Sequence, residues 1–118
     1  MAVTPSFQTF VLEQLARIAP APRAKPMFGG VGIYAGERFF ALIADDVLYL
    51  KADALTRDEF VAAGMAPFRP FGEDAQVMQY YAVSADLLED TEALEPWVTR
   101  ALAAADRKRR PKPRRRPE

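Results

Sequence analysis

The chain of 118 residues contains no cysteine and no histidine. Their absence excludes disulfides, thiol nucleophiles, zinc sites built from these residues, and every catalytic triad or dyad whose base is histidine. Metal ions could be bound only by carboxylates, and hydrolytic chemistry could come only from Asp, Glu, Lys or Tyr. The composition therefore argues against an enzyme, and we expect a protein without catalytic residues or a cofactor.

Long apolar runs are also absent. No run reaches 18 apolar residues, and no charged-then-apolar leader follows Met1, so we expect neither membrane insertion nor secretion, and a cytoplasmic location. Half of the residues are nevertheless apolar, and eight are Phe. That is enough to build the hydrophobic core of one domain.

The net charge of zero hides a strong segregation. Residues 107–118 hold eight of the sixteen basic residues and one of the sixteen acidic residues, which leaves residues 1–106 with eight basic and fifteen acidic residues, a net charge of −7. We expect a folded domain over residues 1–106 and a disordered basic tail over residues 107–118. The basic residues of the tail are Arg107, Lys108, Arg109, Arg110, Lys112, Arg114, Arg115 and Arg116. Three roles remain open for them: a sequence-independent nucleic-acid contact, a contact with an acidic surface, or a solvated tail that aids solubility.

The first half of the chain predicts a helix followed by a meander. Thr4 and Pro5 suit a helix start, and apolar residues at helical spacing predict a helix over about residues 5–18. Prolines at 20, 22 and 26 predict an extended connector. Three consecutive strands are then predicted between residues 27 and 51.

The glycines of residues 30–35 have the spacing of a dinucleotide-binding loop, Gly-x-Gly-x-x-Ala. That chemistry needs a helix N-terminus immediately downstream, whereas here a turn and a second apolar strand follow. We therefore interpret the glycines as part of a bulged or tightly packed strand.

The second half predicts a short helix over residues 56–64, an edge strand over residues 67–71, a strand over residues 76–83, a helical turn to Leu88 and a helix from Thr91. The predicted order is α-β-β-β-α-β-β-α. It indicates a two-layer α+β fold in which helices cover an antiparallel five-stranded sheet.

Two groups of side chains have competing interpretations. Asp45 and Asp46 could bind a metal together with Asp53 or Glu37, but adjacent aspartates between strands usually form a turn. Tyr80 and Tyr81 are neighbours in one strand and face opposite sides, so we expect one of them to be exposed. An uncovered sheet face bearing Tyr, Phe and Met would then serve as a docking or dimerisation surface.

Several motifs in the expected order resemble the N-terminal domain of the TfoX/Sxy family over about residues 10–105. The matching residues are Met27, Phe28, Gly29, Gly30, Gly32, Tyr49, Lys51, Gly64, Pro67, Phe68, Tyr80 and Tyr81. The resemblance implies a two-layer α+β fold and a bacterial, non-enzymatic accessory factor that works with a DNA-bound transcription activator in competence for DNA transformation. Family members tied to competence commonly carry a second helical domain, and a basic tail stands in its place here.

The preferred hypothesis from the sequence is thus a regulatory interaction domain with a protein partner. The alternative is a sequence-independent nucleic-acid-binding protein that acts through the tail, or through tail and body together on a duplex. The charge of −7 argues against a role of the body in that contact.

Overall fold

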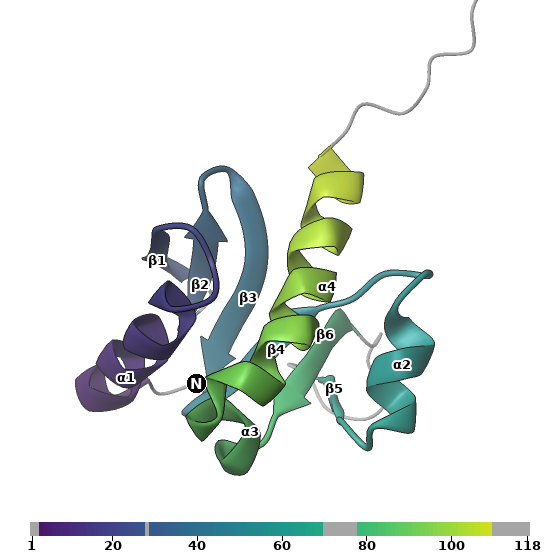
Figure 1. Ribbon diagram of the computed structural model, residues 1–118. Coiled ribbons are helices and arrows are strands. Elements are labelled where there is room, and N and C mark those ends of the chain that lie inside the picture. The colour runs from purple at the N-terminus through teal and green to yellow at the C-terminus, as the bar shows by residue number, and fades with distance from the viewer. Residues whose placement is uncertain (1–2, 28, 70–77, 110–118) are drawn as a thin grey trace, which may run out of the picture.

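The computed structural model describes residues 3–27, 29–69 and 78–109. These residues form one antiparallel sheet with helices packed on one side (Figure 1). The strands are β1 (Pro22–Met27), β2 (Gly30–Ala35), β3 (Arg38–Ala44), β4 (Val47–Lys51), β5 (Pro67–Phe68) and β6 (Met78–Val83). The helices of the described residues are α1 (Pro5–Ala16), α2 (Arg57–Ala62), α3 (Ala85–Glu89) and α4 (Thr91–Arg109).

The strand order is β1-β2-β3-β4-β6-β5, and every neighbouring pair is antiparallel. The predicted α+β class is confirmed, but the predicted number of five strands is wrong because the described residues form six. The additional strand is β1, which lies where the prolines predicted a connector. Pro22 and Pro26 are an even number of residues apart, so their missing N–H donors fall on the same side of the strand. At an edge, that side needs no partner.

The first helix begins where the sequence predicts. The Thr4 hydroxyl accepts a hydrogen bond from the Phe7 N–H (3.3 Å), which caps α1. Asp46 adds a long-range contact, since its carboxylate accepts from the Thr4 N–H (2.8 Å) and from the Thr4 hydroxyl (3.0 Å). Asp45 and Asp46 have φ values of 52° and 56° and form the two-residue turn between β3 and β4, as predicted. This turn therefore also fixes the start of α1.

The glycines of β2 lie in a crowded strand. A Cβ at Gly30 would lie 2.5 Å from the Ile43 carbonyl oxygen. The pairing of β2 with β3 is irregular between Ile33 and Tyr34. The interpretation as a bulged, tightly packed strand is confirmed.

The main core lies between the sheet and the helices. Its largest fully buried side chains are Phe40, Phe60, Leu15, Ile33, Ile43, Leu48, Leu50, Leu94, Val11 and Val98. Helix α4 crosses β3 and β4, as Figure 1 shows, and the small side chains of Ala101, Ala104 and Ala105 are buried there. Small side chains let the helix approach the sheet closely.

Candidate interaction surfaces

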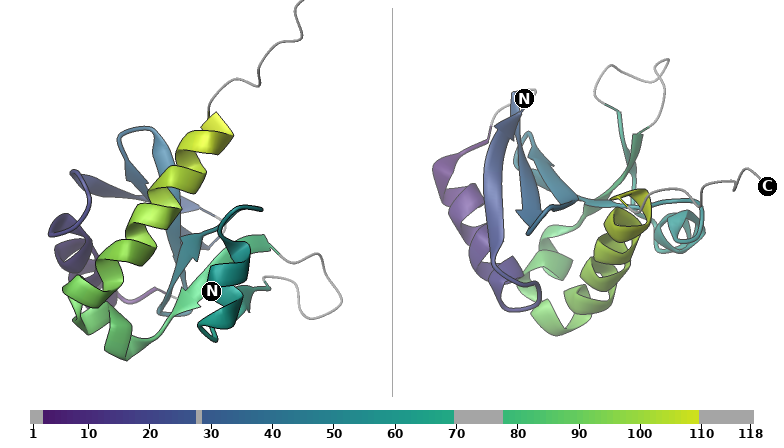
Figure 2. Two further views of the ribbon diagram at one scale, coloured as in Figure 1. Left: turned by 45° about the vertical axis from the view of Figure 1, so that its right-hand side comes forward. Right: turned by 90° about the horizontal axis from the view of Figure 1, so that it is seen from above.

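The sheet face opposite the helices carries a second apolar cluster. This outer face is seen at the open side of the bent sheet in the right-hand view of Figure 2. Leu42, Ala44, Phe68 and Tyr80 are its buried members, and Phe39 and Tyr49 pack against them. Rings from different strands are in contact across the face: Tyr34–Phe39 (5.0 Å between centroids), Phe39–Tyr80 (5.7 Å) and Tyr49–Phe68 (4.8 Å).

The prediction that Tyr80 or Tyr81 is exposed is wrong. Tyr81 is 4% exposed and stacks on Phe60 on the helical side, whereas Tyr80 is 5% exposed and belongs to the outer cluster. The two side chains do point to opposite faces, but each face has its own apolar cluster. The sheet therefore buries aromatic residues on both sides.

Cations lie over the two ends of the aromatic row formed by Tyr34, Phe39 and Tyr80. The Arg23 guanidinium is 5.2 Å from the Tyr34 ring centroid, and the Lys51 ammonium is 5.0 Å from that of Tyr80. Both distances are within the range of cation–π attraction, about 6 Å. The outer face thus presents aromatic rings bracketed by positive charge.

The environment of these groups shifts their ionisation. Burial raises the pKa of Tyr80 to about 12, so its hydroxyl remains protonated under ordinary conditions. Burial also lowers the pKa of Lys51, and repulsion from Lys108 lowers it further, while Asp53 opposes the shift. The Lys51 ammonium lies 3.5 Å from the Tyr80 hydroxyl oxygen.

Most of the family-motif residues gather at this face or at its edges. Met27 and Gly32 are neighbours there, because a Cβ at Gly32 would lie 2.7 Å from Met27 Cε. Tyr49 and Lys51 lie two residues apart in β4 and point to the same face, and Pro67 and Phe68 form β5. The remaining described motif residues are Gly29 in the β1–β2 turn, Gly30 in β2, Gly64 after α2, and Tyr80 and Tyr81 in β6, while Phe28 lies outside the described residues.

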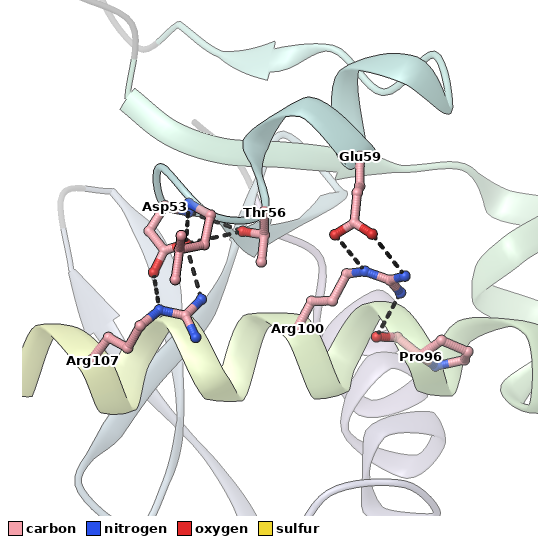
Figure 3. A network of polar contacts seen from close by, with 7 residues as sticks. Asp53, Thr56, Glu59, Pro96, Arg100 and Arg107 are labelled. Atoms are coloured by element: carbon pink, nitrogen blue, oxygen red, sulfur yellow. Dashed lines mark hydrogen bonds and ion pairs between the residues drawn. The ribbon is translucent and has the colours of Figure 1, made fainter.

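The predicted tail begins inside the folded body. Helix α4 extends to Arg109, so Arg107, Lys108 and Arg109 belong to its last turn. The Arg107 guanidinium donates from Nε to Asp53 Oδ2 (2.6 Å) and from Nη2 to Asp53 Oδ1 (3.0 Å), as Figure 3 shows. Residues 110–118, with the other predicted cations Arg110, Lys112, Arg114, Arg115 and Arg116, lie outside the described residues.

A second arginine of α4 makes the same kind of contact two turns earlier. Arg100 donates from Nε and Nη2 to the two carboxylate oxygens of Glu59 (2.9 and 3.2 Å). Residues seven apart lie on one side of a helix, and both arginines face the segment 53–59 (Figure 3). This two-arginine clamp holds the pKa of Asp53 and of Glu59 below their ordinary values, chiefly through the arginine hydrogen bonds.

A docking groove lies on the helical side, where α2 ends beside α3 and the start of α4. Its volume of about 630 Å³ falls in the range of about 300–1,000 Å³ usual for binding pockets. Met65, Leu87 and Trp97 provide large apolar side chains, and Asp86 and Asp90 provide carboxylates. The smaller lining residues are Ala63, Gly64, Ala66, Ala82, Val83, Ser84 and Ala93.

Exposed apolar side chains lie close to this groove in the sequence. Leu55 is 72% exposed and Val61 is 55% exposed, whereas Phe60, which lies between them in the sequence, is fully buried. Sequence reasoning missed the groove, since only the apolar Val61 on the solvent side of α2 hinted at it.

Five exposed carboxylates lie between residues 86 and 95, on α3 and the first turns of α4: Asp86, Glu89, Asp90, Glu92 and Glu95. Two of them, Asp86 and Asp90, line the groove. Asp90 also caps α4, since its carboxylate accepts from the Ala93 N–H (3.1 Å). Within residues 3–27, 29–69 and 78–109, no three acidic side chains gather in a way that could hold a metal ion. No helix of the same residues is long and apolar enough to cross a membrane.

Comparison with known proteins gives one family. The model of the TfoX N-terminal domain matches residues 13–105. No curated protein matches the chain.

Proposed function

This chain belongs to the TfoX N-terminal domain family, and we propose that it is a non-enzymatic interaction domain that acts as an accessory factor in transcription regulation. The partner in this proposal is a protein, namely a transcription activator bound to DNA. The link to competence for DNA transformation belongs to the same proposal and follows from the family alone.

The docking groove is the observation that carries the proposal. Apolar side chains in a concave site with polar residues around them are typical of protein interfaces. Trp97 is the type of residue that dominates the binding energy of such interfaces, and it is only partly buried in the free chain. The exposed Val61 adds apolar surface on the adjoining helix.

The charge of the groove restricts its partner. Asp86 and Asp90 line the groove, and Glu89 and Glu92 stand on the same two helices. Carboxylates repel phosphates and attract basic side chains. A protein segment that combines an apolar side chain with Lys or Arg fits this groove, and DNA-binding proteins are rich in such basic segments.

Substitution of Ala93 tests this proposal. Ala93 is exposed and lines the groove, so Ala93→Arg fills the groove and offsets part of its negative charge without disturbing the core. Thr99→Arg adds the same side chain at an exposed position of α4 that does not line the groove. We expect Ala93→Arg to weaken capture of the activator from the host at least tenfold, and Thr99→Arg to leave it within twofold of the parent chain.

Transcript levels test the regulatory role separately. A deletion strain should change the levels of a set of transcripts, which the parent chain and Thr99→Arg restore and Ala93→Arg does not. Unchanged transcripts in the deletion strain would show that the domain does not regulate transcription. A second copy of the chain in the groove is the alternative occupant, and sedimentation velocity would reveal it as a dimer that Ala93→Arg dissociates.

Nucleic-acid binding by the basic C-terminal segment is the second candidate function. The observation that favours it is the density of charge, eight Lys or Arg within twelve residues. Such a segment binds phosphates without regard to sequence and with strong salt dependence.

A further inference from the structure

We propose that the outer face of the sheet binds single-stranded nucleic acid, with the half-buried rings of Tyr34 and Phe39 as its stacking surface and Arg23 and Lys51 as its phosphate contacts. This site is separate from the docking groove, which lies on the helical side. It is also separate from the basic segment after Arg109.

The aromatic row has the composition of a stacking surface for bases. Its rings come from β2, β3 and β6 and lie 5.0 and 5.7 Å apart, so they form a continuous apolar path across the strands. Tyr34 and Phe39 are half-buried, which leaves part of each ring at the surface, while the buried Tyr80 supports them from below. Proteins that bind single strands without sequence preference stack bases on rings of this kind.

The cations lie where a backbone would run beside those bases. Arg23 and Lys51 are within 5.2 and 5.0 Å of the two end rings. Lys25 lies two residues after Arg23 in β1 and therefore points to the same face. It pairs with Gly32 of β2. Lys108 is close enough to Lys51 to lower its pKa, and Arg107 already engages the neighbouring carboxylate, Asp53, through two hydrogen bonds. A phosphate beside Lys51 would relieve this repulsion.

The largest group of exposed carboxylates lies away from this face. The exposed carboxylates of α3 and α4 lie on the helical side of the sheet, as the right-hand view of Figure 2 shows for these helices. Burial raises the pKa of the Tyr49 phenol, and the turn residue Asp45 lies near enough for its charge to raise that pKa further, whereas Lys51 is at the other end of β4 from Asp45.

Single strands suit this face better than duplexes. Stacking requires unpaired bases, which a duplex does not offer. The rings of the row also contact one another across the strands and do not form a projecting element that would enter a groove of a duplex.

Binding of the full-length chain to fluorescein-labelled dT20 and to a 20-base-pair duplex of random sequence tests the proposal by fluorescence anisotropy. Lys51→Met, Arg23→Met and Tyr34→Leu should each weaken dT20 binding at least fivefold and change duplex binding less than twofold. Lys51→Met should also reduce the salt slope for dT20 by about 0.7, the value for one phosphate contact on a single strand. Arg57→Met removes a charge from the exposed side of α2 and should change neither affinity.

Three results would overturn the proposal. One is equal weakening of dT20 and duplex binding by the outer-face variants, which would indicate only a general loss of charge. Another is an effect of Lys51→Met and Arg23→Met no larger than that of Arg57→Met. The third is displacement of dT20 by poly-glutamate, if the affinity for poly-glutamate is the same in the parent chain and in Tyr34→Leu. That result would show that the face binds acidic protein segments. Arg23 is exposed, so Arg23→Met keeps the test valid even if Tyr34→Leu destabilises the fold.

Discussion

At the scale of single residues, the two glycines of β2 differ in what an added Cβ atom would contact. A Cβ at Gly30 would approach the Ile43 carbonyl oxygen to 2.5 Å, and this backbone atom cannot move without disturbing the β2–β3 pairing. A Cβ at Gly32 would meet Met27 Cε at 2.7 Å and Phe39 Cε1 at 3.0 Å. The end of the Met27 side chain is flexible and can move away.

Gly30→Ala is therefore expected to destabilise the fold by about 1–3 kcal/mol, the usual cost of overpacking. Gly32→Ala should cost less than about 1 kcal/mol and change mainly the outer face. Urea denaturation of both variants measures the difference. Equal losses of stability would contradict the distinction between a rigid and a flexible neighbour.

Tyr80 gives a second prediction at this scale. Its pKa of about 12 implies that its phenol ionises well above the ordinary value of about 10, in an absorbance titration at 295 nm. Tyr80→Phe should remove the transition near pH 12. Because the folded-state pKa is raised above about 10, the contribution of Tyr80 to stability is complete below pH 10 and is lost as the pH rises towards 12.

At the scale of elements, α2 depends on one side chain. A helix of six residues is not stable alone, and Phe60 anchors it between Tyr81 (5.6 Å) and Trp97 (4.9 Å between centroids). Phe60→Ala is expected to cost about 3–5 kcal/mol of unfolding free energy. The neighbouring Val61→Ala, at an exposed position, should change it by less than about 0.5 kcal/mol. Denaturant titration compares the two variants, and a cost below 1 kcal/mol for Phe60→Ala would show that α2 is held by other contacts.

The two-arginine clamp predicts a pH dependence. Arg107→Gln should lower stability by about 1 kcal/mol at pH 7, because both members of the Arg107–Asp53 pair retain contact with solvent. The folded-state pKa of Asp53 is depressed, so the contribution is present above the unfolded value of about 3.9 and is lost as the pH falls below it. The difference in Tm between parent and variant should therefore shrink between pH 5 and pH 3. Arg57→Gln is the control, since its pair with Asp58 spans 3.9 Å between exposed side chains.

Sequence patterns predicted which helices and strands form better than the residues at which they begin and end. The meander and the helices follow from apolar spacing and from local caps such as Thr4, which act within a few residues. The strand β1 was missed because its prolines are tolerated only at an edge, and edge position is a property of the whole sheet. The end of α4 was missed because Arg107 is held by Asp53, a residue 54 positions away, whereas its local sequence is that of a solvated tail.

The candidate sites were less predictable for the same reason. Tyr80 and Tyr81 could be assigned to opposite faces from alternation, but a second apolar cluster on the outer face depends on side chains from β3, β4 and β5. The docking groove combines α2, α3, α4 and β6 and has no motif of its own. Only the charge of the C-terminal segment could be read directly from the sequence.

At the scale of the whole molecule, the charge distribution separates the folded body from its C-terminal segment. A chain that ends at Arg109 keeps the clamp and should have the Tm of the parent chain. It lacks five cations, Arg110, Lys112, Arg114, Arg115 and Arg116. We expect the slope of log Kobs against log salt for duplex binding to fall by up to about 4.5, because each phosphate that is no longer neutralised lowers it by about 0.9.

A chain that ends at Ala105 should behave differently. It lacks Arg107 and also Asp106, which pairs with Arg38 (3.6 Å). Its Tm should fall by about 5 °C or more, since about 1 kcal/mol corresponds to about 4–8 °C in a domain of this size. Identical melting of the two shortened chains would show that the last turn of α4 is not part of the fold.

Helix α4 also sets a length. Its 19 residues make a rigid rod of about 28 Å, with the docking groove beside its first turns and the cationic segment leaving its far end. In the proposed complex, an activator bound in the groove would therefore lie about one helix length from Arg109, and inserting a turn into α4 would lengthen that separation by about 5 Å.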